Sequence, residues 1–177
     1  DAGRLSNKMA SFNDFVDVTA DFLRRGLVDP QRIFASGGSA GGLLVAAVAN
    51  MAPDFYRGIV ATAPFVDVLT TMLDEGLPLT TLEYDLWGDP RDPDAYRYIL
   101  GYSPYDNVRP QDYPWMLVTT SLNDSQVMYW EPAKWVARLR ATKTDHNPLY
   151  FKTNMAGGHG GSSGRYDRLH EAAFRYA

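Results

Sequence analysis

The chain has 177 residues, no cysteine and a formal net charge of −4. This length suits one domain with a sizeable core, and the acidic balance gives no basic field for nucleic acid or for a membrane surface. No apolar run approaches a membrane span, and no disulfide framework exists. A reducing compartment is therefore permitted, and we expect a cytoplasmic protein.

Strands and helices alternate along the chain. The first helix is predicted over residues 12–26, with Phe15, Val18, Phe22 and Leu23 on its buried face. Short buried strands are expected at 32–36, 58–63, 115–120 and 149–152, and further helices at 43–48, 131–142 and 165–177. This order predicts an α/β fold with a mostly parallel sheet and flanking helices.

One serine stands among glycines between the first predicted strand and the second helix. The segment 37–42, GGSAGG, fits the G-x-S-x-G pattern of a nucleophile elbow, in which Ser39 would stand exposed at the carboxyl edge of the sheet. We expect glycine at 37 and 41 because side chains there would collide with neighbouring chain. The Ala40 amide, at the start of the helix, would bind a developing oxyanion. Such a turn also serves phosphate binding or close packing.

Two further polar residues follow later predicted strands. Asp124 comes directly after the third strand, and His159 stands in the glycine loop GGHGG after the fourth. The order serine, acid, histidine is that of the α/β hydrolases, so Asp124 would orient the imidazole and His159 Nε2 would lie within hydrogen-bond reach of Ser39 Oγ. A capping or turn aspartate and a structural histidine are the alternatives. His146 and His170 are expected at the surface.

The stretch 65–107 departs from the alternation. It contains short helical pieces near 68–74 and 93–100, separated by proline and glycine, and is too long for an ordinary connection in such a sheet. Long loops over the carboxyl edge of a sheet usually shape a binding site.

Eight stretches of the sequence carry a family resemblance. They are SFNDF at 11–15, the elbow at 37–42, PFVDV at 64–68, TMLDE at 71–75, SPYDN at 103–107, DSQV at 124–127, YWEPAKWV at 129–136 and GGHGG at 157–161. With them, the chain resembles the catalytic domain of the oligopeptidase B group in the prolyl oligopeptidase family of serine peptidases. The resemblance implies an α/β-hydrolase fold, cleavage of short peptides after arginine or lysine, and no metal or cofactor.

The same resemblance implies a larger enzyme. Residues 1–177 would be the C-terminal catalytic part, a truncated portion of the domain, with an N-terminal β-propeller and the first strands outside this sequence. The propeller would restrict access to short peptides. A tyrosine upstream of the first residue would supply the second oxyanion donor.

Site residues follow from the matching motifs. Ser39 matches the nucleophile, Asp124 the acid, His159 the base and Ala40 the backbone oxyanion donor. In the long insertion, Glu83 matches the principal acidic residue for a basic P1 side chain. At the second acidic position Asp85 is one methylene shorter than the usual glutamate.

From the residues alone, solvated loop charges are the favoured interpretation of Glu83 and Asp85. Gln126 stands where prolyl oligopeptidase has a substrate-binding arginine, which disfavours proline specificity. Besides the peptidase, two functions remain open: an esterase, aminopeptidase-like or other acyl-peptide hydrolase on the same fold, and a non-catalytic interaction module or inactive fragment.

Overall fold

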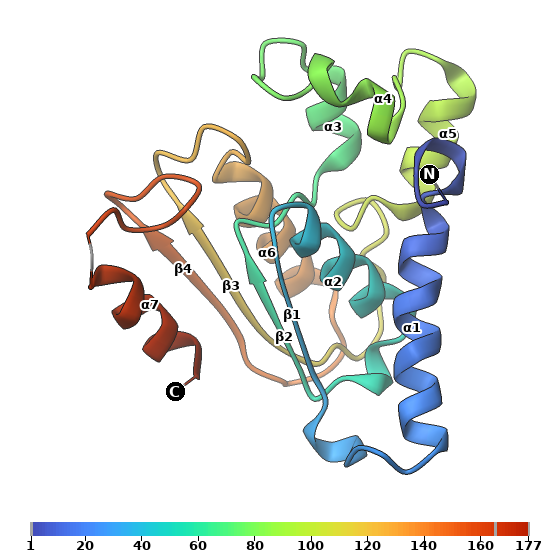
Figure 1. The fold of residues 1–177 in the computed structure, drawn as a ribbon, viewed down its shortest axis with the longest axis vertical. Coiled ribbons are helices and arrows are strands. Elements are labelled where there is room, and N and C mark those ends of the chain that lie inside the picture. The colour runs from blue at the N-terminus through green and yellow to red at the C-terminus, as the bar shows by residue number, and fades with distance from the viewer. Residues whose placement is uncertain (1, 165, 177) are drawn as a thin grey trace.

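Four parallel strands form one sheet in sequence order (Figure 1). The computed structural model describes residues 2–164 and 166–176. The strands are β1 (Phe34–Gly38), β2 (Gly58–Thr62), β3 (Trp115–Ser121) and β4 (Leu149–Asn154). Their register places Ala35 beside Ile59, Ile59 beside Met116 and Met116 beside Leu149. The expected parallel sheet with flanking helices is confirmed.

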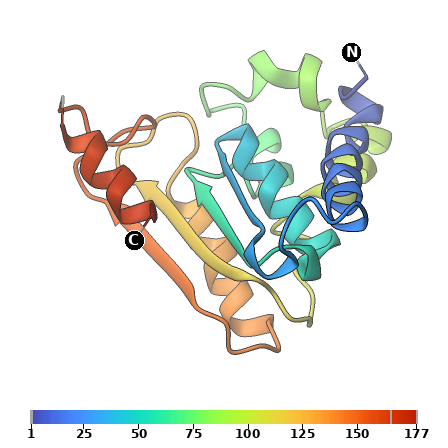
Figure 2. The ribbon, with the colours of Figure 1, turned by 60° about the horizontal axis from the view of Figure 1, so that its bottom comes forward.

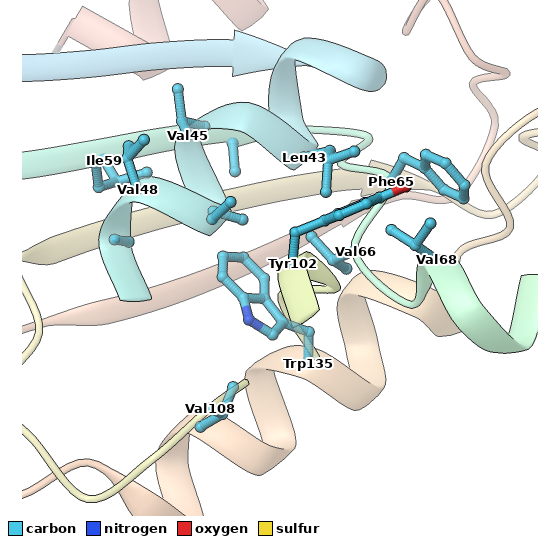
Figure 3. Packing of buried hydrophobic residues seen from close by; sticks show 14 of the residues in the cluster. Leu43, Val45, Val48, Ile59, Phe65, Val66, Val68, Tyr102, Val108 and Trp135 are labelled. Carbon is cyan, nitrogen blue, oxygen red and sulfur yellow. The ribbon is translucent and has the colours of Figure 1, made fainter. Parts of the chain in front are cut away.

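Helices from three parts of the chain cover one face of this sheet. Helix α2 (Ala40–Met51) packs on β1 and β2, α6 (Trp130–Thr142) packs on β3 and β4, and α1 (Met9–Arg24) packs against α2. The strands are added in one direction across the sheet, so right-handed connections place α2 and α6 on the same face. The buried residues between helices and sheet form the core shown in Figure 3, among them Leu43, Val45, Val48, Ile59 and Trp135.

The expected buried face of the first helix is only partly correct. Val18 and Phe22 are 52% and 43% exposed, whereas Phe12 and Thr19 are buried and Phe15 is half-buried. The helix presents to α2 the stripe that starts at Phe12 and recurs every three or four residues. Val18 and Phe22 fall on its outer side.

The first strand lies two residues later than expected and is not buried on both sides. Phe34 is 63% exposed. Trp115 and Tyr150 lie on the same face of the sheet and are 42% and 64% exposed. Side chains alternate between the two faces of a strand, and α2 and α6 both cover the face that carries Ala35. The opposite face is therefore largely open in the described structure.

The long insertion lies over the carboxyl ends of the strands, as predicted (Figure 1). It contains α3 (Val68–Leu73), the 3₁₀ turn η4 (Thr81–Glu83), α4 (Tyr84–Trp87) and α5 (Pro93–Tyr102). Three more 3₁₀ turns occur elsewhere: η1 (Leu5–Asn7), η2 (Pro30–Arg32) and η3 (Pro53–Phe55).

The last helix, α7 (Asp167–Tyr176), lies beside β4, apart from the other helices (Figures 1 and 2). Its expected end residues, Arg165 and Ala177, lie outside the described residues. Across residues 2–164 and 166–176, no helix combines the length and apolar character that a bilayer crossing demands.

Candidate active site

Ser39 occupies a strained turn between β1 and α2. Its φ of 55° and ψ of −122° lie in a region that residues other than glycine rarely adopt. The turn is held from both sides, because the Ser39 N–H donates to the Thr62 carbonyl at 3.0 Å. In addition, the Ser39 carbonyl accepts from the N–H groups of Leu43 and Phe65, both at 3.1 Å. These contacts fix the side chain at the carboxyl edge of the sheet.

The glycines around Ser39 have unequal roles. A Cβ on Gly37 would stand 2.1 Å from the Gly41 carbonyl oxygen, so this position requires glycine. At Gly41 the expected collision is absent, since an added Cβ meets no atom within 4 Å. Gly42 is the second tight position, because its Cβ would approach Pro64 Cα to 2.6 Å. The steric requirement therefore falls on 37 and 42, not on 37 and 41.

Ala40 is the first residue of α2 and lines the same pocket as Ser39. The first amides of a helix have no intrahelical acceptor, and the helix dipole places partial positive charge there. The geometry thus leaves an amide donor beside the Ser39 side chain.

Asp124 and His159 are brought together. His159 Nδ1 lies 2.8 Å from Asp124 Oδ2 and 3.0 Å from Oδ1, and the Asp124 side chain is fully buried. Asp124 Oδ1 also accepts from the backbone N–H groups of Gln126 (2.9 Å) and Val127 (3.0 Å). The turn role and the imidazole contact therefore coexist in one carboxylate, and the turn fixes its orientation.

The loop that carries His159 is closed by a polar network that the sequence analysis missed. Asn154 Oδ1 accepts from the Gly157 N–H at 2.9 Å, and Asn154 Nδ2 donates to Ser162 Oγ (2.8 Å) and Glu171 Oε1 (2.9 Å). The Ser162 N–H also donates to Glu171, at 3.1 Å. Burial raises the pKa of Glu171, but the hydrogen bonds from Ser162 and Asn154 outweigh it and leave that pKa below its usual value.

Ser39 and His159 face different pockets in this structure. Among residues 2–164 and 166–176, no hydrogen bond joins Ser39 Oγ to His159, so the expected contact is not formed here. His159 lines a pocket with Thr62, Thr119 and Lys152, beside the ends of β2, β3 and β4. Asp124 and His159 are in contact, and Ser39 stands separately at the neighbouring elbow.

Ser39, Ala40 and Glu83 line one small pocket of about 50 Å³. Glu83 is half-buried, and its Oε2 accepts from Trp87 Nε1 at 2.6 Å. The Asp85 side chain is exposed and is not among the pocket-lining groups. The structure thus brings one of the two predicted acidic residues to the serine.

Trp87 and Lys8 surround Glu83 and were not predicted. The Lys8 Nζ lies over the Trp87 ring, 4.3 Å from its centroid. Burial lowers the pKa of Lys8, and the negative charge of Glu83 partly opposes that shift. Trp87 could have been found, because it lies one helical turn after Glu83. Lys8 comes from a distant part of the chain and gave no sequence signal.

Comparisons with known proteins cover the whole chain. A sequence profile described as the prolyl oligopeptidase family matches residues 1–177. "Protease 2" of Moraxella lacunata is 56% identical over 99% of this chain and 25% of its own length. "Dipeptidyl aminopeptidase BI" of Pseudoxanthomonas mexicana is 55% identical over 100% of this chain and 24% of its own length.

Solved structures give the same result. Oligopeptidase B from Trypanosoma brucei, with covalently bound antipain in a closed form, matches 99% of this chain and 25% of its own, with 44% identity and a TM-score of 0.97. The chain therefore spans about a quarter of the length of these relatives. The α/β-hydrolase fold and the resemblance to the oligopeptidase B group are confirmed.

Proposed function

Because the chain belongs to the prolyl oligopeptidase family, we propose that it is the catalytic part of a serine peptidase that uses Ser39, His159 and Asp124. The observation that carries the proposal is the buried Asp124 carboxylate on His159 Nδ1, at the same sheet edge as a serine held in the strained elbow. Phosphate binding does not require an acid–imidazole pair, and neither does close packing of a glycine turn.

The proposed reaction is acyl transfer. Ser39 Oγ attacks the scissile carbonyl carbon while His159 Nε2 takes the hydroxyl proton, and the Ala40 amide donates to the resulting oxyanion. His159 then gives that proton to the leaving amine, which leaves an acyl-enzyme on Ser39. Water repeats the sequence and frees the serine. Asp124 holds Nδ1 protonated, so that Nε2 is the acceptor.

This cycle requires the His159 loop to approach Ser39. Hydrogen bonds between catalytic groups are often long or absent without substrate and form in the complex. The loop sequence GGHGG offers little side-chain bulk to oppose such a movement.

For the substrate, we propose short peptides with arginine or lysine at P1. Support comes from Glu83, whose carboxylate lines the pocket of Ser39 and Ala40. A guanidinium can pair with a carboxylate through two parallel hydrogen bonds. The pocket of about 50 Å³ has room for only a few water molecules, so a long basic side chain would have to open it. Asp85 would add negative charge from the exposed rim.

We also propose that residues 1–177 are the C-terminal catalytic part of a longer enzyme, in which a β-propeller limits entry to short peptides. The share of the relatives that the chain covers, about a quarter, supports this arrangement. The cytoplasmic location remains a prediction.

A second function has its own support. The 55% identity to a protein named dipeptidyl aminopeptidase favours release of dipeptides from a free amino terminus as the alternative to internal cleavage. Reporter peptides that end in arginine, with free or blocked amino termini, would separate the two functions in the full-length protein. Faster cleavage of the free form would favour the aminopeptidase.

The general test is a panel of arginine, alanine and proline reporter peptides with a short-chain ester, alongside fluorophosphonate labelling. The proposal predicts labelling at Ser39 and preference for arginine. Ester hydrolysis without peptide cleavage would identify an esterase, and no labelling would identify a non-catalytic module.

A further inference from the structure

Glu131, in the first turn of α6, is a buried carboxylate that the proposed mechanism does not use. It is 1% exposed, and its Oε2 accepts from the backbone N–H groups of Val66 (3.2 Å) and Asp67 (3.1 Å). Its Oε1 accepts from Thr71 Oγ1 at 2.7 Å. All three donors belong to the connection between β2 and α3 or to α3 itself. One side chain of α6 therefore fixes this segment.

The same segment forms a wall of the pocket beside Ser39. Phe65 and Thr71 both line that pocket. The Phe65 N–H donates to the Ser39 carbonyl at 3.1 Å, and the Phe65 ring meets the Trp87 ring edge-on with centroids 5.4 Å apart. Trp87 in turn donates to Glu83. Contacts thus run without a break from the Glu131 carboxylate to both the elbow and the acidic side of the pocket.

The charges around Glu131 come from two sides. Asp67 faces it from the β2–α3 connection and is 1% exposed, and Lys134, one turn along α6, pairs with Asp67 Oδ2. Tyr105 faces Lys134 from the α5–β3 connection, with Nζ 4.8 Å from the ring centroid. Burial raises the pKa of Glu131 to about 7, against the opposing hydrogen bonds from Thr71 and the two amides. Glu131 therefore changes charge near neutral pH.

We propose that Glu131 is a positioning residue for the peptide pocket: its charged carboxylate holds the segment 65–71 in the form that admits substrate, and protonation loosens it. The pocket's role in binding peptide rests on the function proposed above. An amide donates more strongly to a charged carboxylate than to a neutral acid. Loss of that charge assistance corresponds to about a five-fold smaller equilibrium constant for the ordered form of segment 65–71.

The first experiment measures KM for an arginine reporter peptide from pH 8 to pH 6 in the full-length protein. We expect KM to rise about five-fold for the wild type as the pH falls. In Glu131→Gln, KM should stay flat near the wild-type low-pH value. The two proteins differ only at residue 131, so the difference between the two profiles isolates that residue. Equal slopes in both proteins would overturn the proposal.

Thr71→Val provides a second variant, which leaves residue 131 itself unchanged. It removes one of the hydrogen bonds that lower the pKa of Glu131, so the break in the KM profile should move to higher pH. An unmoved break would count against the proposal. Asp145→Asn is the matched control, because Asp145 is also a buried carboxylate and accepts from the Tyr113 N–H at 2.7 Å, but it lies at the amino ends of the strands. Its profile should equal the wild type.

Amide hydrogen exchange gives a readout that does not depend on activity. After correction for intrinsic rates, a peptide spanning residues 63–73 should lose protection between pH 8 and pH 6 in the wild type but not in Glu131→Gln. Constant protection in the wild type would overturn the positioning role. If fluorophosphonate does not label the protein but the exchange difference is present, the proposed function fails and the positioning role stands.

Discussion

Replacement of Glu83 by glutamine should remove the preference for arginine while leaving the chemistry intact. Glutamine keeps the shape of Glu83 and can still accept from Trp87 Nε1, so the main change is the lost charge. Two unit charges 4 Å apart interact by about 4 kcal/mol at an effective dielectric constant of 20. Because Glu83 is only half-buried, we take about 3 kcal/mol, which corresponds to roughly a 100-fold change.

Lys8 does not enlarge this effect. Its ammonium lies over Trp87 beside Glu83, and its repulsion of an entering basic side chain is the same with and without the Glu83 carboxylate.

The assay is the ratio of kcat/KM for arginine and alanine reporter peptides in the full-length protein. Glu75→Gln is the matched control, because Glu75 lies in the same insertion but is exposed and pairs with Arg91 outside the pocket. Labelling of Ser39 by a neutral fluorophosphonate should be unchanged in both variants. A ratio within about three-fold of the wild type in Glu83→Gln would show that Glu83 belongs to the solvated surface.

Three further outcomes are expected. Ser39→Ala should abolish hydrolysis and labelling, and Asp124→Asn should lower turnover by roughly four orders of magnitude through the wrong imidazole tautomer; normal turnover in either would remove that residue from the mechanism. Asp85→Asn should reduce the arginine preference by less than Glu83→Gln, and an equal loss would place Asp85 in contact with substrate. Finally, burial raises the pKa of Glu131 from 4.5 to about 7, so the native state holds its proton more tightly than the unfolded state, and the free energy of unfolding falls as the pH rises through this interval. This sign concerns global unfolding, in which Glu131 enters water; the proposed local loosening has the opposite sign because Glu131 stays buried there and loses only its hydrogen bonds. Glu131→Gln should remove this fall of about 3 kcal/mol in the free energy of unfolding, which denaturant unfolding at pH 5 and pH 8 would measure; an unchanged difference would refute it.

The parallel sheet and the elbow could be predicted because both are local patterns. Apolar runs such as 115–120 mark strands, and a serine among glycines after a strand marks the turn. Asp124 and His159 could be placed at one sheet edge because each follows a strand of the same parallel sheet. Their 2.8 Å contact is what that topology implies.

Other features depend on contacts that no local pattern encodes. Val18 and Phe22 looked suitable for the core, but the position of α2 decides which stripe of α1 is covered. Phe34 was expected to be buried, yet the helices cover only the other face of its strand. Glu131 lies 60 to 65 positions from its donors, so its role could be seen only in three dimensions.

The backbone conformation of Ser39 has opposite consequences for a selection on thermal stability and a selection on turnover. A residue other than glycine held in such a conformation costs about 1–3 kcal/mol, and glycine would relieve that strain. A laboratory screen for heat resistance alone would accordingly enrich glycine at this position, whereas a screen for turnover would keep serine. Thermostable variants of this chain should therefore be sought among residues remote from the elbow, and position 39 itself would report which pressure a library had experienced.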